Sequence, residues 1–99
     1  MVTSEAILEA LKPVEDPELG MSIIDLGLVY RAEDVGDGIE VDFTLTYPGC
    51  PLGEQIQDDI VDRLAHVFHV SVRTKLVFEP VWTQARMSEE ARVGMGYPI

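Results

Sequence analysis

The stretch IEVDFTLTYPGCPLGEQIQDDIVDRLAHVF, residues 39–68, decides the fold. In its first nine residues apolar and polar side chains alternate, which predicts a β-strand with one buried face. In its second half apolar side chains recur every four residues, which predicts an amphipathic helix. These helical positions are Leu52, Ile56, Ile60, Leu64 and Phe68. The prolines and glycine between the two patterns predict a sharp corner, where a strand ends and a helix begins.

The residues that flank this stretch add two more strands. Residues 36–38, Gly-Asp-Gly, are a tight-turn signal, and the strand-like residues 26–33 precede them, so we expect a hairpin. Residues 70–79 alternate again after the helix, and a strand–helix–strand connection makes its two strands parallel through a right-handed crossover. Opposite charges on these two strands suggest that they are neighbours in the sheet. The charges are Glu40 and Asp42 on one strand and Arg73 and Lys75 on the other.

Two short helices complete the prediction. The first covers residues 3–14, with Ser4 as its cap and Pro13 as its stop, and Ser88 is expected to cap a short helix near the C-terminus. The predicted order is helix, strand, strand, helix, strand, then the short C-terminal helix. We therefore expect an α+β fold in a single domain, residues 1–99. It is a two-layer sandwich with helices on one face of a three-stranded mixed sheet.

The composition excludes several classes of function. Seven basic residues face eighteen acidic ones, a formal charge of -11. Phosphate backbones and anionic membranes would be repelled, whereas cationic partners and metal ions would be attracted. No run of ~18 apolar residues is present, so no membrane span is expected. A single cysteine excludes an internal disulfide and fits a reducing cytoplasm. We expect a small acidic cytoplasmic protein without nucleic-acid or membrane partners.

The only cysteine, Cys50, lies at the predicted corner. Pro51 suits the first helical position, which places Cys50 within one residue of the helix start, where the positive helix end favours a thiolate. Such a thiolate suits a nucleophile or a soft-metal ligand, although a cysteine packed as a small apolar side chain fits the sequence equally well. A thiol enzyme also needs a base, and His66 and His69 lie at the far end of a helix about 25 Å long. No enzymatic site is therefore expected within the chain.

A second feature is an acidic segment, residues 15–22, which has no period and is predicted to be a loop. Three carboxylates, Asp16, Glu18 and Asp25, fall within ten residues. Asp-Pro is a common turn opener, so solvated carboxylates would explain the pattern. The surrounding side chains are largely apolar, however. We therefore expect the segment to pack onto the core and to bring a carboxylate with it.

Three motifs, taken together, point to a known family. DPELGMSIIDLGLVY, TLTYPGCPL and EPVWTQARMSEEAR follow in this order and cover nearly the whole chain. They closely resemble the SufT/PaaD-like iron–sulfur cluster maturation family, the small domain that is also fused to Mrp-type scaffold ATPases. The resemblance implies the fold predicted above. It also implies a non-enzymatic role in iron–sulfur cluster assembly or transfer, with iron or a cluster bound transiently and with cluster-assembly or client proteins as partners.

The resemblance also implies a site in which the acidic loop and the cysteine corner share one surface pocket. The expected metal ligands are Cys50, Glu18 and Asp16, the expected pocket residues are Pro17, Asp25, Thr46 and Pro51, and the expected partner surface is Trp82, Arg86 and Met87.

Cluster irons usually take four cysteine ligands in total. One chain offers one cysteine, so a bound cluster must be shared with a second copy of the chain or a partner, or be completed by other ligands. A homodimer therefore stays open.

Three alternatives remain. In a protein-binding adaptor, Cys50 would only be packed, and Trp82 with the apolar loop would form a docking surface. A thiol enzyme would borrow its base from a partner. A small subunit of a phenylacetate-degradation-type hydroxylase system is the third, but such family members carry an additional cysteine-rich C-terminal region. No cysteine follows Cys50 in this chain, which favours the single-domain maturation branch.

Overall fold

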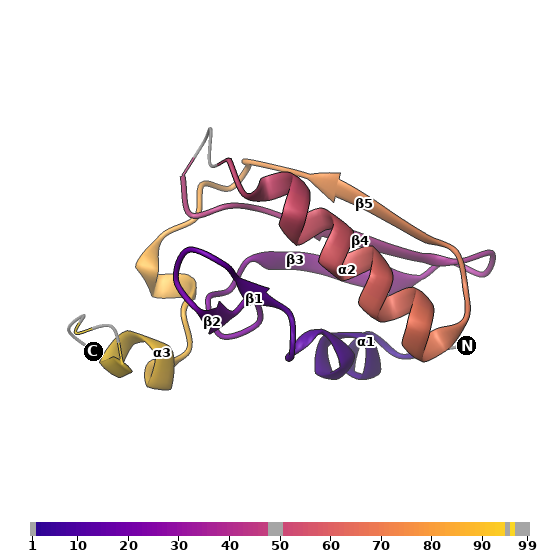
Figure 1. The fold of residues 1–99 in the computed structure, drawn as a ribbon, viewed down its shortest axis with the longest axis horizontal. Coiled ribbons are helices and arrows are strands. Elements are labelled where there is room, and N and C mark those ends of the chain that lie inside the picture. Colours follow the sequence, from indigo (N-terminus) through magenta and orange to yellow (C-terminus); the bar gives the residue numbers. More distant parts are fainter. Residues whose placement is uncertain (1, 48–50, 95, 97–99) are drawn as a thin grey trace.

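The computed structural model describes residues 2–47, 51–94 and 96 (Figure 1). Its helices and strands are α1 (Ser4–Leu11), β1 (Glu15–Asp16), β2 (Met21–Ser22), β3 (Val29–Asp34), β4 (Ile39–Phe43), α2 (Gly53–Phe68), β5 (Val72–Leu76), the 3-10 helix η1 (Gln84–Arg86) and α3 (Glu89–Gly94). The predicted order of elements is confirmed, with the two-residue strands β1 and β2 and the 3-10 helix η1 as additions. None of the described helices combines the length and apolar character that crossing a membrane requires.

The main sheet has the strand order β3-β4-β5, with β3 and β4 antiparallel and β4 and β5 parallel. The predicted three-stranded mixed sheet is therefore confirmed, including the hairpin and the crossover. In the parallel pair, the register places Glu40 opposite Arg73 and Asp42 opposite Lys75. The opposite charges thus identified the neighbouring strands correctly.

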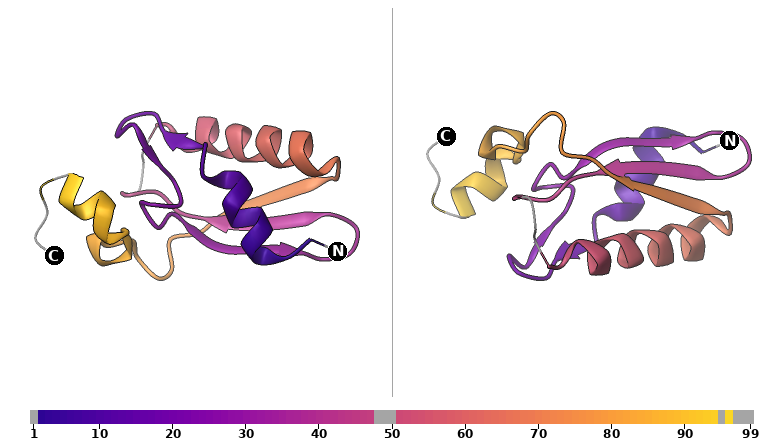
Figure 2. Two further views of the ribbon diagram at one scale, coloured as in Figure 1. Left: turned by 90° about the horizontal axis from the view of Figure 1, so that it is seen from below. Right: turned by 90° about the horizontal axis from the view of Figure 1, so that it is seen from above.

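Helices α1 and α2 pack against each other on one face of this sheet (Figure 2). Every second residue of β4 is buried, which directs one face of the strand toward the two helices. The buried side chains that meet there include Ile7 and Leu11 of α1, Ile39, Val41 and Phe43 of β4, and Ile56, Ile60 and Leu64 of α2. Burying one such side chain stabilises the fold by about 1.5–3 kcal/mol. The apolar residues of the strand and of the helix within residues 39–68 therefore pack together in one core.

The other face of the sheet carries an ion-pair network. Arg31 of β3 donates to Glu33, Glu40 and Asp42 at 2.7, 2.8 and 3.0 Å. Arg73 of β5 also pairs with Glu40, at 3.2 Å. Single exposed ion pairs contribute little to stability, and a network that joins neighbouring strands contributes more. Charge therefore links all three strands on the face that the helices leave open.

Two predicted helix boundaries are wrong. Thr3, and not Ser4, caps α1, because the Thr3 hydroxyl accepts a hydrogen bond from a backbone N–H of the first turn at 3.1 Å. Helix α2 begins at Gly53, so Pro51 does not open it. Pro51 lies instead in a turn before the helix, where a fixed φ and a missing N–H are also tolerated.

Candidate functional site

The acidic segment forms a tight turn between β1 and β2, which pair antiparallel, rather than an irregular loop. Asp16 holds this turn: its Oδ1 accepts hydrogen bonds from the N–H groups of Glu18 at 2.8 Å and Leu19 at 3.2 Å. Its carbonyl oxygen accepts a third from Gly20 at 2.7 Å. Asp16 is buried, with 1% of its surface exposed. The turn is therefore fixed from inside by one carboxylate and presents the carboxylate of exposed Glu18 on its outside.

A hydrogen bond joins this turn to the segment that follows β4. Tyr47 Oη donates to Glu18 Oε2 at 3.2 Å. Alternation along the strand predicted that Tyr47 points into the core, but it is 42% exposed. Strand β4 ends at Phe43, and beyond the end of a strand the two-residue period no longer fixes the direction of a side chain. Tyr47 precedes Cys50 by three residues, so the acidic turn lies beside the segment that leads to the cysteine.

The C-terminal segment is held by the loop that precedes β3. Trp82 Nε1 donates to the carbonyl oxygen of Leu26 at 2.6 Å, and the N–H of Ser88 donates to the carbonyl oxygen of Asp25 at 2.8 Å. Ser88 also caps α3 as predicted, because its Oγ accepts a hydrogen bond from the N–H of Ala91 at 3.1 Å. These bonds fix the segment on both sides of η1.

Tyr30 and Gly27 make further contacts with the same segment. Tyr30 Oη donates to the carbonyl oxygen of Pro80 at 2.7 Å, and the Arg86 guanidinium lies 4.0 Å from the centre of the Tyr30 ring. Gly27 has a φ of +73° and lies against the main chain of Arg86. Only glycine tolerates both the positive φ and such a close backbone approach. The C-terminal segment is thus positioned by side chains and main chain together.

These contacts bring the three motifs together around one pocket of about 270 Å³, which we call the motif pocket. The acidic turn, the segment after β4 and the C-terminal segment contribute two lining residues each, and the loop before β3 contributes one. The lining residues are Glu18, Leu19, Leu26, Thr46, Tyr47, Trp82 and Met87. Glu18 is the only charged residue among them. Among the described residues, the motif pocket is therefore lined by apolar and aromatic side chains, one threonine and one carboxylate.

The motif pocket collects part of the predicted site. Glu18 and Thr46 line it together with Trp82 and Met87. Asp16 lies buried within the turn that presents Glu18, as its hydrogen bonds to the turn amides show. Met87 is 4% exposed and belongs to the hydrophobic core, and Trp82 is half-buried. Two of the residues expected on a partner surface therefore also anchor the C-terminal segment.

The remaining predicted residues lie elsewhere. Pro17 lines a separate hollow beside α2, and Asp25 and Pro51 are exposed and are not among the described residues that line the motif pocket. Arg86 stacks on an aromatic ring of β3 and does not line the pocket either. Cys50 lies outside the described residues.

The corner between β4 and α2 is tightly packed where the structure describes it. A Cβ on Gly53, the first residue of α2, would stand 3.0 Å from the side chain of Leu45. Glycine at this position therefore lets the helix start close to the chain that leaves β4. The helix starts three residues after Cys50 in the sequence, so the prediction that it starts within one residue of Cys50 is wrong. A helix end that favours the Cys50 thiolate stays a prediction.

No three His, Cys, Asp or Glu side chains among residues 2–47, 51–94 and 96 are arranged to hold a metal ion. His66 lies in the last turn of α2, and His69 is its left-handed C-cap with a φ of 56°. Both are exposed, as expected for residues at a helix C-terminus. A metal ion at the motif pocket would therefore need ligands beyond Glu18, from Cys50 or from another molecule.

Sequence reasoning missed three residues that line the motif pocket: Leu19, Leu26 and Tyr47. The sequence predicted only that the two leucines belong to an apolar loop that packs onto the core. Tyr47 carried a usable signal, because a tyrosine at the end of a strand presents an apolar ring with a polar tip. It also lies within the motif that contains Cys50.

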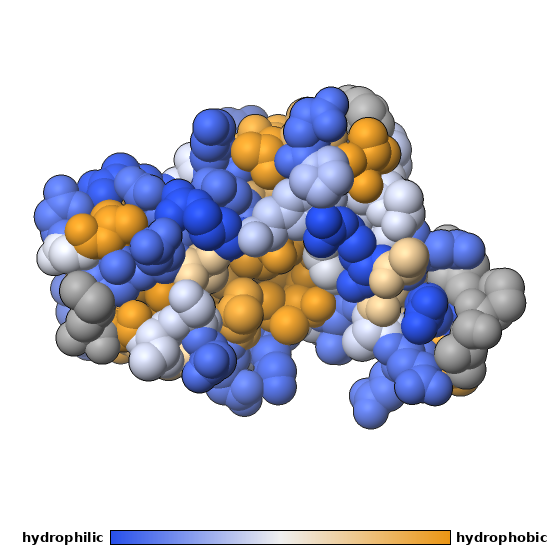
Figure 3. Space-filling view, turned by 180° about the vertical axis from the view of Figure 1, so that it is seen from behind, coloured by the Kyte–Doolittle hydropathy of each residue, from blue (hydrophilic) through white to orange (hydrophobic). Residues whose placement is uncertain are grey.

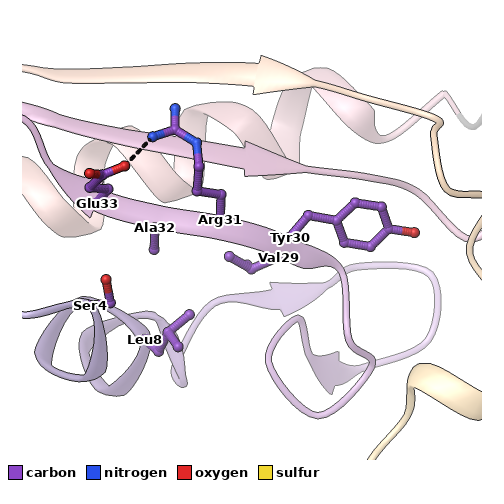
Figure 4. A pocket seen from close by; sticks show the side chains of 7 residues that line it. All are labelled: Ser4, Leu8, Val29, Tyr30, Arg31, Ala32 and Glu33. Carbon is purple, nitrogen blue, oxygen red and sulfur yellow. Dashed lines mark hydrogen bonds and ion pairs between the residues drawn. The ribbon is translucent and has the colours of Figure 1, made fainter.

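A second hollow, of about 360 Å³, lies between α1 and β3. Ser4 and Leu8 project from α1 toward β3, and Ala32 points back at them, whereas Arg31 and Glu33 point to the other side of the strand and pair with each other (Figure 4). Figure 3 shows the molecule from behind the view of Figure 1. On the face seen there, apolar side chains gather in the middle, and mostly hydrophilic side chains lie toward the two ends. The charged residues of this hollow already have partners, so we prefer the motif pocket as the functional site.

Comparison with known proteins agrees with the resemblance that the three motifs indicated. The model of the iron–sulfur cluster assembly protein family matches residues 4–74. The Fe-S protein maturation auxiliary factor YitW of Bacillus subtilis is 40% identical over 94 residues, which cover 93% of this chain and 92% of that protein. The Fe-S protein maturation auxiliary factor SufT of Staphylococcus aureus is 41% identical over 85 residues, which cover 84% of this chain and 97% of that protein.

The fold is shared as well. The crystal structure of a domain of unknown function from Bacillus anthracis is similar with a TM-score of 0.88 and 34% identity, over 96% of this chain and 92% of that one. A more distant relative is an Escherichia coli protein named as a candidate component of 1,2-phenylacetyl-CoA epoxidase, 34% identical over 83 residues. These cover 83% of this chain but 50% of the Escherichia coli protein, so the similarity extends over half of that protein.

Proposed function

Since the chain belongs to the iron–sulfur cluster assembly protein family, we propose that it is a non-enzymatic factor that receives iron or an iron–sulfur cluster and passes it on. Its partners would be cluster-assembly proteins or the client proteins that need a cluster. Two relatives similar over most of their length are named Fe-S protein maturation auxiliary factors. The single cysteine fits a reducing compartment, and we place the activity in the cytoplasm.

One observation carries this proposal: the hydrogen bond from Tyr47 to Glu18. It joins the acidic turn to the segment that leads to Cys50, over a sequence separation of 29 residues. A thiolate is a soft ligand for iron and a carboxylate is a hard one. We propose that Cys50 and Glu18 hold the incoming iron together at the rim of the motif pocket.

Asp16 holds the turn that carries Glu18. Its Oδ1 already accepts two hydrogen bonds from the amides of the turn, whereas Glu18 is exposed on the outside of that turn. Glu18 is therefore the better oxygen ligand of the two. The larger part of the role of Asp16 is to fix the direction in which Glu18 points.

A cluster held in this way would be shared between molecules. Cluster irons usually take four cysteine ligands in total, and the chain has one cysteine. The missing ligands would come from an assembly protein, a client protein or a second copy of the chain. An incomplete ligand set also explains how the cargo could leave, because a fully coordinated cluster would have to be stripped of its ligands first.

The adaptor alternative is favoured by a different observation. Val81, next to Trp82, is 68% exposed, and Leu76 and Phe78 of the preceding segment are also exposed apolar side chains. These three exposed side chains lie close together in the sequence, and contiguous exposed apolar patches often mark protein-binding surfaces. In the adaptor, this surface would act alone and Cys50 would bind no iron.

Anaerobic loading with ferrous iron and sulfide, followed by transfer to an apo-ferredoxin, separates the two functions. Wild type is compared with Cys50→Ser, Glu18→Gln and the control Glu15→Gln. Glu15 is an exposed carboxylate on β1, so the control removes the same charge close to the site. We expect Cys50→Ser to abolish transfer and Glu15→Gln to behave as wild type. Glu18→Gln should weaken iron binding by about tenfold or more, because even the loss of a residue that only supports a metal ligand typically costs that much.

Two results would count against this proposal. Transfer by Cys50→Ser at the wild-type rate would favour the adaptor. A stable four-iron cluster on a strictly monomeric wild-type chain would show that the cluster is not shared between molecules.

A further inference from the structure

We propose that the motif pocket also receives an arginine side chain from the partner protein. The proposal rests on the function above in one respect, since the partner would be the assembly or client protein that exchanges iron with this chain. It assigns a docking contact to the pocket and names the chemistry of the group that enters it.

The charge of the motif pocket calls for a cation. Glu18 is the only charged residue among those that line it, and within residues 2–47, 51–94 and 96 it forms no ion pair. Its hydrogen bond from Tyr47 comes from an uncharged hydroxyl and is long, at 3.2 Å, so it leaves the negative charge of the carboxylate uncompensated. The whole chain adds a formal charge of -11, which raises the local concentration of cationic partners.

The walls of the motif pocket select the kind of cation. Trp82 and Tyr47 line it together with apolar Leu19, Leu26 and Met87. The hydrogen bond of 2.6 Å from Trp82 Nε1 to Leu26 holds the indole in place before any partner arrives. A guanidinium group stacks on aromatic rings and at the same time donates two parallel hydrogen bonds to a carboxylate. Lysine, with its compact and strongly hydrated charge, uses such a site less well.

The size of the motif pocket fits a single side chain. Its volume is about 270 Å³, below the range of roughly 300–1,000 Å³ that is usual for pockets that enclose small-molecule ligands. A single long side chain reaching in from a partner surface suits this volume. Exposed Val81, next to Trp82, would then contact the surface from which the side chain extends.

The chain already makes one part of this contact internally, the stacking of a guanidinium on an aromatic ring. The Arg86 guanidinium lies 4.0 Å from the centre of the Tyr30 ring. Arg86 thus lies on Tyr30 and is not among the described residues that line the motif pocket. No arginine, lysine or histidine of the described residues lines the pocket, so the cation would come from another molecule.

Arginine docking and iron binding would use the same carboxylate. A partner arginine on Glu18 would therefore compete with iron for this oxygen ligand. Docking of the partner would weaken the hold on the iron at the moment when a second protein is present to accept it. The two events are nevertheless measured separately, because an arginine peptide contains no iron and ferrous iron contains no guanidinium.

The experiment is an NMR titration of the full chain, free of metal, with the peptide acetyl-Gly-Arg-Gly-amide. The matched probe is the same peptide with citrulline, which keeps the shape of arginine and lacks its charge. Trp82 is the only tryptophan, so its indole N–H signal reports on the motif pocket without ambiguity. Glu18→Gln is compared with Glu15→Gln, and ferrous iron is titrated separately into each variant.

We expect the arginine peptide to shift the signals of Trp82, Leu19 and Leu26, and the citrulline peptide to bind about tenfold more weakly, which is the scale of one ion pair with one cation–π contact. Glu18→Gln should lose this preference, and Glu15→Gln should keep it. Shifts spread over the acidic residues of α2, which are Glu54, Asp58, Asp59 and Asp62, without preference for Trp82 would overturn the proposal. So would equal binding of the two peptides. Failure of iron binding with intact arginine binding would instead count against the proposed iron site alone.

Discussion

Gly27 lies against the main chain of Arg86 so closely that a β-carbon at position 27 would overlap the Arg86 carbonyl group. The loop before β3 and the C-terminal segment therefore meet backbone to backbone. This contact stands next to the hydrogen bond from Trp82 to Leu26. A single atom in the wrong place at Gly27 would thus disturb one wall of the motif pocket.

Gly27→Ala should destabilise the protein more than Gly36→Ala does. Both glycines have a positive φ, but a Cβ on Gly36 would meet nothing within 4 Å. Alanine in such a conformation costs about 1–2 kcal/mol, and only Gly27→Ala adds the overlap with Arg86. Urea unfolding measures the difference, and the native fluorescence of Trp82 should change in Gly27→Ala alone. Equal losses of stability in the two variants would show that the backbone contact is not required.

Asp16→Ala should open the acidic turn, whereas Asp16→Asn should largely preserve it. Alanine leaves two turn amides without their acceptor, which costs about 1–3 kcal/mol for a buried group, while asparagine keeps an oxygen in the same place. The two amides belong to Glu18 and Leu19. Hydrogen exchange at these amides, read alongside urea unfolding, tests the prediction. Alanine tolerated as well as asparagine would mean that the turn does not depend on Asp16.

The ion-pair network on the open face of the sheet should make Glu40 sensitive to acid. The hydrogen bond from Arg31 first, and the charge and hydrogen bond of Arg73 second, hold the pKa of Glu40 below its ordinary value of 4.5. A carboxyl whose pKa is lower in the folded state contributes stability above its unfolded pKa and loses it as the pH falls through the folded pKa. Glu40→Gln should therefore be less stable than wild type at pH 6, and the difference should shrink as the pH falls below about 4.

The comparison is the free energy of unfolding of each protein at a series of pH values. Glu15→Gln is the control, because its carboxylate has no ion pair among the described residues. A constant difference between wild type and Glu40→Gln from pH 6 to pH 3 would show that the network does not stabilise the folded state through this carboxylate.

Glu18→Gln should make the metal-free Cys50 thiol react faster. A carboxylate ~6 Å from a thiolate opposes it by about 2.8 kcal/mol at an effective dielectric of 20, which outweighs the roughly 0.3–1 kcal/mol by which a helix N-terminus favours an anion. We therefore expect Glu18 to raise the pKa of the Cys50 thiol and to slow its alkylation at neutral pH. The measurement is the rate of iodoacetamide alkylation as a function of pH in the absence of metal.

Asp16→Asn and Glu15→Gln serve as comparisons for this effect, since the Asp16 side chain is buried inside the turn and the Glu15 side chain is exposed. A thiol that reacts rapidly at pH 6 in wild type, at a rate unchanged by Glu18→Gln and Asp16→Asn, would show that no carboxylate stands beside Cys50.

The sequence was sufficient for the three strands of the main sheet, for the helices α1, α2 and α3, and for their arrangement, because these depend on local patterns, whereas β1, β2 and η1 were not predicted. Alternation gave β4, spacing by four gave α2, and the charges of Glu40 and Arg73 gave the neighbour of β4. The errors fall where local patterns end. After Phe43 the sequence still alternates between apolar and polar residues, but the strand has ended. The side chain of Tyr47 is therefore exposed instead of buried.

The spacing of apolar residues along the chain is a local property that the sequence shows directly. The sequence by itself therefore determined the two-layer fold and the approximate place of a corner near Cys50. Only the tertiary structure decided that Glu18 meets Tyr47 and that Trp82 meets Leu26, contacts over 29 and 56 residues. Such contacts depend on how two loops pack against each other, and no period in the sequence encodes that packing. The motif pocket exists because Asp16, Gly27 and the segment around Trp82 fix these loops in three dimensions.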